Sequence, residues 1–469
     1  MRIEKDSLGQ LELPDNAVYG IHSLRSSNNF PSSNEQVNPH LIKAYLLVKK
    51  AAAVTNKNCN LLDEEKYSLI ENAINKLLEE ADSAIESDNK SIFEKVIVDP
   101  YQGGAGTSLN MNINEIITNT ALKLGGKNYG GYDFIHPLDD VNMSQSTNDT
   151  FPTALKIAVI YLLRELSEAF ALFQRSLQNK EEEFKGIIKL ARTQYQDAVP
   201  ITLGQEFGAY AQAVARDRWR VYNCEERIRS VNLGGTAVGN SITAERKYVL
   251  TINANLKKIT GLPIAKGEDL IDTTQNQDTL VEVHGLAKAG SVSLQKICND
   301  LRFLSSGPAG GIGEINLPPK QSGSSIMPGK VNPVILENAI QICELIKAND
   351  LIITNLSSAG HLELNPFMPM IAHTMLKSLS MLKDVLRNVS KNCIHGITAN
   401  KEKCKSNLIN TSAIAASLIP TLGYDKIEQL VKEAFDKDKK FIDLLFESGL
   451  LTEEELYKIL SKEIGIEIE

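Results

Sequence analysis

Residues 280–304 read LVEVHGLAKAGSVSLQKICNDLRFL, and this stretch decides the fold. Apolar residues recur in this stretch at intervals of three and four, and this spacing places one apolar stripe along one face of a helix. A long helix with a repeat near 3.5 residues is typical of a bundle whose helices cross at shallow angles. The stripe keeps alternating intervals of three and four without a break: Leu280, Val283, Ala287, Gly290, Leu294, Ile297, Leu301 and Leu304.

Four other stretches carry the same pattern. They are Val159, Leu163, Leu166, Phe170, Phe173 and Leu177; Leu203, Phe207, Tyr210, Val214 and Val221, interrupted by Asp217; Ala372, Met375, Leu379, Leu382, Leu386 and Val389; and the shorter Ile335, Ala339, Ile342 and Ile346. Together with the first stretch they predict a mainly α fold with a central bundle of five long helices. Small residues such as Ala287 and Gly290 permit close approach of neighbouring helices.

The chain has 469 residues, which allows two or three domains. We expect boundaries near residues 140 and 396. Residues 1–140 would form a mixed, mostly helical domain with helices at about 41–54 and 64–85, residues 141–396 the bundle, and residues 397–469 a small helical domain.

Helix starts are marked by proline and by capping-box spacing. Pro200 suits the first turn of a helix, so it is expected to open one. The pairs Asp425 with Glu428 and Thr452 with Glu455 have the spacing of a capping box and indicate two short helices near the C-terminus.

Composition excludes several classes of function. The net charge is −8 and no basic run stands out, which argues against a nucleic-acid partner. No apolar run approaches the length of a membrane span, and the N-terminus does not resemble a signal peptide. Six scattered cysteines indicate reduced thiols of a cytoplasmic protein, and the seven histidines show no metal-binding spacing. We therefore expect no metal and no cofactor.

A second stretch, residues 323–333, reads GSSIMPGKVNP and concentrates chemical groups within one turn. Glycine and proline shape a turn whose N–H groups, together with Lys330, suit a carboxylate or an oxyanion. A serine there can act as a base only if its alkoxide is stabilised, which these donors could do. A phosphate loop is excluded, because five residues separate Gly323 from Gly329 and Val331 follows the lysine.

Three further segments accompany this stretch in order: GGAGTSLNMN at 103–112, SQSTND at 144–149 and RTQYQDA at 192–198. Together the four resemble the signature segments of the aspartase/fumarase superfamily, and the resemblance runs from about Arg2 to the C-terminus. It implies a homotetramer whose bundles merge and whose sites each draw on three chains. Helix length agrees, because thirty residues span ~45 Å and would separate motifs at opposite helix ends.

The resemblance also implies a role for each site residue. Ser324 would be the base, and Asn148 would contact an α-amino group. Thr107, Ser146, Thr147 and Ser325 would be donors to a β-carboxylate, and Thr193, Lys330 and Asn332 ligands of an α-carboxylate. Gln194 stands where fumarases usually carry histidine, so the implied reaction is reversible elimination of ammonia from L-aspartate, giving fumarate through an aci-carboxylate. Taken singly, Thr107, Ser146, Thr147 and Asn148 would be ordinary cap or turn residues.

The chain departs from the family pattern at Ala309, at Asn240–Thr243 and at Pro366–Met368. These changes remove none of the predicted groups but leave the substrate range open. Fumarate hydration, or a lyase reaction on another substituted succinate, is the enzymatic alternative. A structural protein related to the lens crystallins of this superfamily is the other, and the intact Ser324 and Lys330 argue against it.

Overall fold

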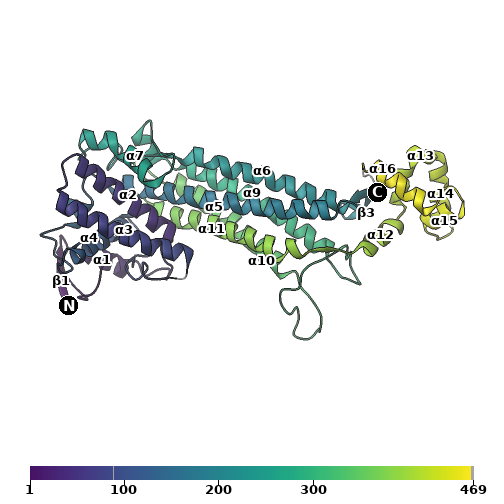
Figure 1. The fold of residues 1–469 in the computed structure, drawn as a ribbon, viewed down its shortest axis with the longest axis horizontal. Coiled ribbons are helices and arrows are strands. Elements are labelled where there is room, and N and C mark those ends of the chain that lie inside the picture. Colours follow the sequence, from purple (N-terminus) through teal and green to yellow (C-terminus); the bar gives the residue numbers. More distant parts are fainter. Residues whose placement is uncertain (88, 466–469) are drawn as a thin grey trace. The chain divides into compact units, whose positions relative to one another are not determined.

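The computed structural model describes residues 1–87 and 89–465, and its secondary structure is mainly helical (Figure 1). This confirms the predicted fold class. Five helices form the long elements: α5 (Thr147–Glu183), α6 (Leu203–Ile228), α9 (Asp278–Leu304), α10 (Val334–Ser358) and α11 (Met368–Asn392). The other helices are α1 (Ile21–Asn29), α2 (Pro39–Asn58), α3 (Glu64–Glu86), α4 (Thr107–Leu124), α7 (Arg246–Thr260), α8 (Leu270–Gln275), α12 (Lys401–Ile409), α13 (Ile419–Leu422), α14 (Tyr424–Asp436), α15 (Phe441–Glu447) and α16 (Glu453–Glu463), with short π or 3-10 turns at Pro137–Val141, Ile394–Gly396 and Ser412–Leu418.

The described strands pair only in twos. The antiparallel pairs are β1 (Arg2–Asp6) with β2 (Gly9–Leu13), β3 (Ile188–Thr193) with β4 (Gln196–Thr202), and β7 (Ile315–Asn316) with β8 (Thr398–Ala399). The fourth pair, β5 (Ser230–Val231) with β6 (Ala265–Lys266), is parallel. None of the described helices is long and apolar enough to span a bilayer.

The chain divides into two compact units, and the division passes through the five long helices. The first unit comprises Met1–Ser167, Arg220–Lys288 and Leu345–Leu382, and the second Glu168–Trp219, Ala289–Glu344 and Lys383–Glu469. Each unit therefore contains a segment of every long helix. The predicted domain boundaries near residues 140 and 396 stay a prediction.

The apolar stripes predicted from the sequence are buried in four of the five long helices. In α9 every residue of the stripe from Leu280 to Leu304 is buried, and the stripes of α5, α6 and α11 are buried as well. Within the second unit, a Cβ at Gly290 would lie 2.6 Å from the ring of Phe170, so glycine lets α9 approach α5 closely. Asp217, which interrupts the α6 stripe, is itself 1% exposed.

For α10, two of the four residues predicted to form the buried stripe are wrong. Ala339 and Ile346 are buried as expected, but Ile335 and Ile342 are only partly buried. Leu336 and Cys343 take the buried positions instead. Apolar residues stand next to each other in this helix, as Ile335 and Leu336 do, and neighbours point to different faces. Spacing alone therefore does not identify the face that packs inward.

The prediction that Pro200 opens a helix is wrong. Pro200 lies in β4, opposite Leu190 of β3, and α6 begins only at Leu203. A two-stranded ribbon tolerates proline because an edge position needs no N–H donor.

The terminal helices are largely as predicted. The expected helices at 41–54 and 64–85 correspond to α2 and α3. Thr452 and Glu455 form a capping box at α16, which confirms that prediction. The capping box predicted at Asp425 is wrong, because Gly423 is the N-cap of α14 and Asp425 lies inside the first turn.

Candidate active site

The predicted site residues fall in both units. Thr107, Ser146, Thr147 and Asn148 belong to the first unit, and Thr193, Gln194, Ser324, Ser325, Lys330 and Asn332 to the second. Each group has its own scaffold, built from helix ends in the first unit and from a hairpin and a loop in the second.

Thr107 stands at the first position of α4, after a turn that requires left-handed backbone. Gly104, Ala105 and Gly106 have φ values of 79°, 56° and 94°. A Cβ on Gly106 would overlap the ring of Phe151 in α5, so only glycine fits there. The Thr107 side chain is exposed, and its Oγ1 donates to the carbonyl of Gly104 at 2.8 Å. The segment thus presents a hydroxyl at a helix N-terminus, while the N–H of Leu109 in the same turn donates to Gln102 Oε1 at 2.6 Å.

Ser146 precedes α5 and caps it. Its Oγ accepts the N–H of Asn148 at 3.2 Å, and its own N–H donates to Asp149 Oδ1 at 3.0 Å. Thr147 is the first helical residue and is 8% exposed. The Asn148 amide donates to the carbonyl of Ala237 at 2.8 Å. The helix begins at Thr147, so Ser146 is its N-cap.

The first turns of α4 and α5 touch each other. Thr150 Oγ1 lies 3.4 Å from Asn110 Oδ1, and Gly106 faces Phe151. Each helix N-terminus carries a partial positive charge. Two such ends, with Thr107 on one and Ser146 on the other, favour a bound carboxylate at this place.

A buried lysine, which the sequence interpretation missed, links these two helix starts. Lys49 of α2 is 1% exposed, and its Nζ donates to Asn142 Oδ1 at 3.0 Å and to Gln145 Oε1 at 2.9 Å. The same Asn142 oxygen accepts the side-chain amides of Asn110 and Asn114 of α4, each at 3.1 Å. The turn before α5 is therefore fastened to α4 and α2 together.

Asp149 provides a second set of hydrogen bonds that holds the start of α5. Its Oδ2 accepts the N–H groups of Gly234 at 3.1 Å and Thr236 at 3.0 Å. Burial raises the pKa of Asp149 to about 6, against the backbone donors that favour its charged form. Burial likewise lowers the pKa of Lys49 to about 7, against the opposing charge of Asp149. Because three N–H groups point at Asp149 and none of its oxygens donates, we assign it the carboxylate form.

In the second unit, Ser324 lies near the middle of the loop between β7 and α10. Its Oγ accepts the backbone N–H groups of Ile326 at 3.2 Å and Met327 at 3.1 Å. Two donors aimed at one oxygen favour its negative form. The geometry at Ser324 therefore has the donors that a serine base requires.

The loop closes on itself across its two ends. The N–H of Gly323 donates to the carbonyl of Lys330 at 3.0 Å, and the Asn332 amide donates to the carbonyl of Gly323 at 2.6 Å. Asn332 thus has a structural contact in addition to its predicted role. Ser325 and Lys330 are exposed, and Lys330 has no ion pair within the described part of the chain.

Thr193 and Gln194 lie at the tip of the β3–β4 hairpin. Thr193 pairs with Gln196, and the two central residues, Gln194 and Tyr195, have φ values of 55° and 62°. Positive φ at both positions is the mark of a type I′ turn. Both predicted residues are exposed there.

One buried carboxylate anchors the hairpin and the strand that leads to the serine loop. Glu314 is 0% exposed and forms ion pairs with Arg192 at 2.8 Å and Lys189 at 3.0 Å. Burial raises the pKa of Glu314, but the Arg192 hydrogen bond and the Lys189 charge outweigh it, so the pKa is lowered. Asn407 of α12 also donates to this carboxylate at 3.0 Å.

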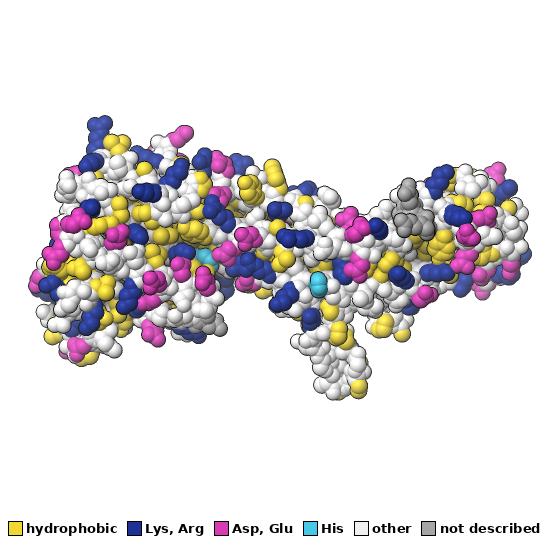
Figure 2. Space-filling view, in the orientation of Figure 1, with side chains coloured by type: hydrophobic (Ala, Val, Ile, Leu, Met, Phe, Trp, Pro, Cys, Tyr) yellow, Lys and Arg dark blue, Asp and Glu magenta, His cyan; other side chains and the backbone are white. Residues whose placement is uncertain are grey.

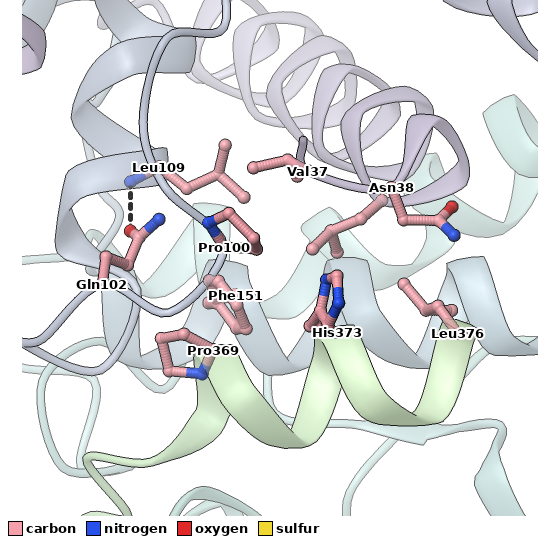
Figure 3. Close-up of a pocket in the computed structure, with 10 residues that line it drawn as sticks. Val37, Asn38, Pro100, Gln102, Leu109, Phe151, Pro369, His373 and Leu376 are labelled. Atoms are coloured by element: carbon pink, nitrogen blue, oxygen red, sulfur yellow. Dashed lines mark hydrogen bonds between the residues drawn. The ribbon is translucent and has the colours of Figure 1, made fainter. Parts of the chain in front are cut away.

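Two cavities among the described residues are lined by other side chains than the predicted ones. A cavity next to the start of α4, shown in Figure 3, has a mostly apolar lining and a volume of about 10 Å³, room for at most one water. A groove of about 970 Å³ in the second unit, lined in part by Glu181, Lys401 and Glu402, contains none of them. The predicted residues lie on helix ends and loops instead.

Two family models and several known proteins match this chain. A family model described as Lyase matches residues 9–347, and one described as Fumarase C C-terminus matches residues 414–464. The aspartate ammonia-lyase of Bacillus sp is 43% identical over 98% of this chain and 96% of its own length. That of Escherichia coli K12 is 40% identical over 98% and 95%.

Solved structures agree on the fold. The fumarate lyase:delta crystallin from Brucella melitensis bound to cobalt has a TM-score of 0.93 and 39% identity, with both chains covered completely. The class II fumarase from Schistosoma mansoni has a TM-score of 0.86 and 27% identity, with 99% of each chain covered. These matches span nearly the whole sequence, and the chain therefore belongs to the aspartase/fumarase superfamily of lyases.

Proposed function

We propose that the protein catalyses the reversible elimination of ammonia from L-aspartate to give fumarate. The observation that carries this proposal is the 43% identity to an aspartate ammonia-lyase along 98% of the chain. Identity to the class II fumarase is lower, at 27%. Gln194, in place of the histidine usual in fumarases, favours the same choice.

The chemical difficulty is the weak acidity of the proton on C3 of aspartate. We assign its removal to the Ser324 alkoxide, which the N–H groups of Ile326 and Met327 stabilise. The electron pair moves into the β-carboxylate, which becomes a dianionic aci-carboxylate. Donors aimed at such a developing charge are usually the largest catalytic contribution, and loss of one costs ~10²–10³ in rate.

We assign those donors to Thr107, Ser146, Thr147 and Ser325. In the second half of the reaction the electron pair returns to form the C2–C3 double bond, and the C2–N bond breaks. Nitrogen leaves as ammonia, which takes up a proton from water, and Ser324 gives its proton to solvent. Thr193, Lys330 and Asn332 would hold the α-carboxylate, and Asn148 the amino group before it leaves.

We further propose a homotetramer in which each site combines segments of different subunits. Large apolar side chains are exposed on the long helices: Tyr222 (73%) on α6, Val292 (51%) on α9 and Leu351 (63%) on α10. Figure 2 shows hydrophobic side chains on the loop between β7 and α10, where Ile326 is 82% exposed. Large apolar side chains exposed on long helices favour an interface. Light scattering should give four times the chain mass of 51.6 kDa, and an active monomer would refute the assembly.

We also propose a cytoplasmic location, which the six thiols support, because all are free and buried. The proposed reaction is tested by following fumarate absorbance with purified protein. L-aspartate should be deaminated, while malate and argininosuccinate, tested in parallel, should give no fumarate. Malate dehydration at a comparable rate would overturn the choice of substrate.

A further inference from the structure

We infer that Tyr195 is a positioning residue for the proposed α-carboxylate site. Its ring, seated on Phe303, holds the tip of the β3–β4 hairpin so that Thr193 and Gln194 keep one orientation. The inference rests on the proposed function, because Thr193 and Gln194 matter only if they contact the substrate.

The backbone at Tyr195 is the first observation. With φ of 62° it occupies the left-handed region, directly after Gln194 at 55°. A type I′ turn prefers asparagine and glycine at these two positions, and a bulky aromatic residue there is a conformational outlier. Such outliers persist only where the surrounding structure holds them, and they cluster at functional sites.

The contact with Phe303 is the second observation. The two ring centroids lie 5.0 Å apart with the ring planes at 78°, the edge-to-face arrangement that aromatic pairs favour. Phe303 belongs to the last turn of α9, in the same unit as the hairpin. Tyr195 is otherwise 78% exposed, so core packing does not account for the ring.

The hairpin is thus held at two ends. At its base, Lys189 pairs with the buried Glu314, and Arg192, which lies one residue pair below the tip, pairs with the same carboxylate. At its tip, Tyr195 meets Phe303. Thr193 and Gln194 lie between the two anchors, and the directions of their side chains depend on both. Removing the tip anchor should leave the base, and therefore the fold, in place.

The test compares Tyr195→Asn with Tyr195→Phe in steady-state kinetics with L-aspartate. Asparagine suits the left-handed turn but removes the ring, whereas phenylalanine keeps the ring and its contact. Tyr195→Asn should raise KM about 2- to 12-fold, which corresponds to the ~0.5–1.5 kcal/mol of an aromatic pair. Its kcat should change less than its KM, and its Tm should equal or exceed that of the wild type. Tyr195→Phe should keep the wild-type KM.

Phe303→Leu supplies an independent arm from the other side of the contact. It should raise KM like Tyr195→Asn, and the double variant should be no worse than either single one, because both changes remove the same contact. The inference is overturned if Tyr195→Asn keeps the wild-type KM, if its Tm falls, if Tyr195→Phe raises KM equally, or if the two effects multiply. A wild-type enzyme without activity on L-aspartate would instead refute the proposed function, and this inference with it.

Discussion

Replacing Glu314 with glutamine removes a buried negative charge that holds both the hairpin and the strand leading to the serine loop. The carboxylate is 0% exposed, and its partners Lys189 and Arg192 have side chains that are only 1% and 15% exposed. In the variant Lys189 keeps its second ion pair, with Glu206 at 2.9 Å, whereas Arg192 loses its ion pair with Glu314.

The magnitude follows from this burial. Removing one member of a buried ion pair costs about 3–5 kcal/mol, because the remaining charge is left uncompensated. An exposed pair contributes only about 0–1 kcal/mol. Lys405 with Glu453 is such a pair, with side chains 45% and 57% exposed. We therefore expect Glu314→Gln to lower the free energy of unfolding by about 3–5 kcal/mol, and the matched control Glu453→Gln by less than about 1 kcal/mol.

Urea unfolding at pH 7, followed by circular dichroism, measures both variants against the wild type. Lowering the pH gives a second readout. The pKa of Glu314 is lowered in the folded protein, so its stabilisation is present above the unfolded pKa of about 4.3 and is lost as the pH falls through the folded pKa. The difference between wild type and Glu314→Gln should hold from pH 7 to about pH 5 and shrink below about pH 4. If both variants lose the same free energy at pH 7, the anchoring role of Glu314 is refuted.

Three further substitutions test other parts of the account. Ser324→Ala should lower kcat by ~10²–10⁴ and change KM far less, because a general base acts only in the transition state; a loss confined to KM would contradict the assignment. Lys330→Ala should mainly raise KM in the same assay, because a ground-state carboxylate loses its charge partner; an unchanged KM would argue against that contact. Gly106→Ala should lower Tm more than Gly104→Ala, since both have positive φ but only the former places a Cβ against Phe151; equal losses of Tm would show that backbone strain alone decides.

The sequence predicted most of the helical architecture because long apolar repeats report directly on burial. The uninterrupted repeat of α9 is buried at every position. The repeat of α10 was misread because Ile335 and Leu336 are both apolar, and spacing cannot choose between neighbouring faces. The β3–β4 hairpin was missed because Pro200 was interpreted as a helix start.

The sequence motifs predicted the site residues. They did not predict the side chains that hold those residues in place. Lys49 lies on a helix beside apolar neighbours, Leu46 to Val48 and Ala51, and a lysine in such a setting is a signal for a buried, paired charge. Its partners Asn142 and Gln145 lie far along the chain, so only the fold could show the contact. Glu314 is likewise an ordinary acidic residue in sequence, and its role appears only with the positions of Lys189 and Arg192.

Subunit mixing tests the central claim most directly, because it asks whether the two scaffolds complete one catalytic site across chains. Ser146 and Ser324 lie in different units, and the variants Ser146→Ala and Ser324→Ala should each be inactive alone. Equal amounts are mixed under conditions that exchange subunits, and mixed tetramers are verified by mass. If the segments come from different chains, about a quarter of the wild-type activity on L-aspartate should return. Verified mixed tetramers that stay inactive would contradict the shared site or the assignment of one serine.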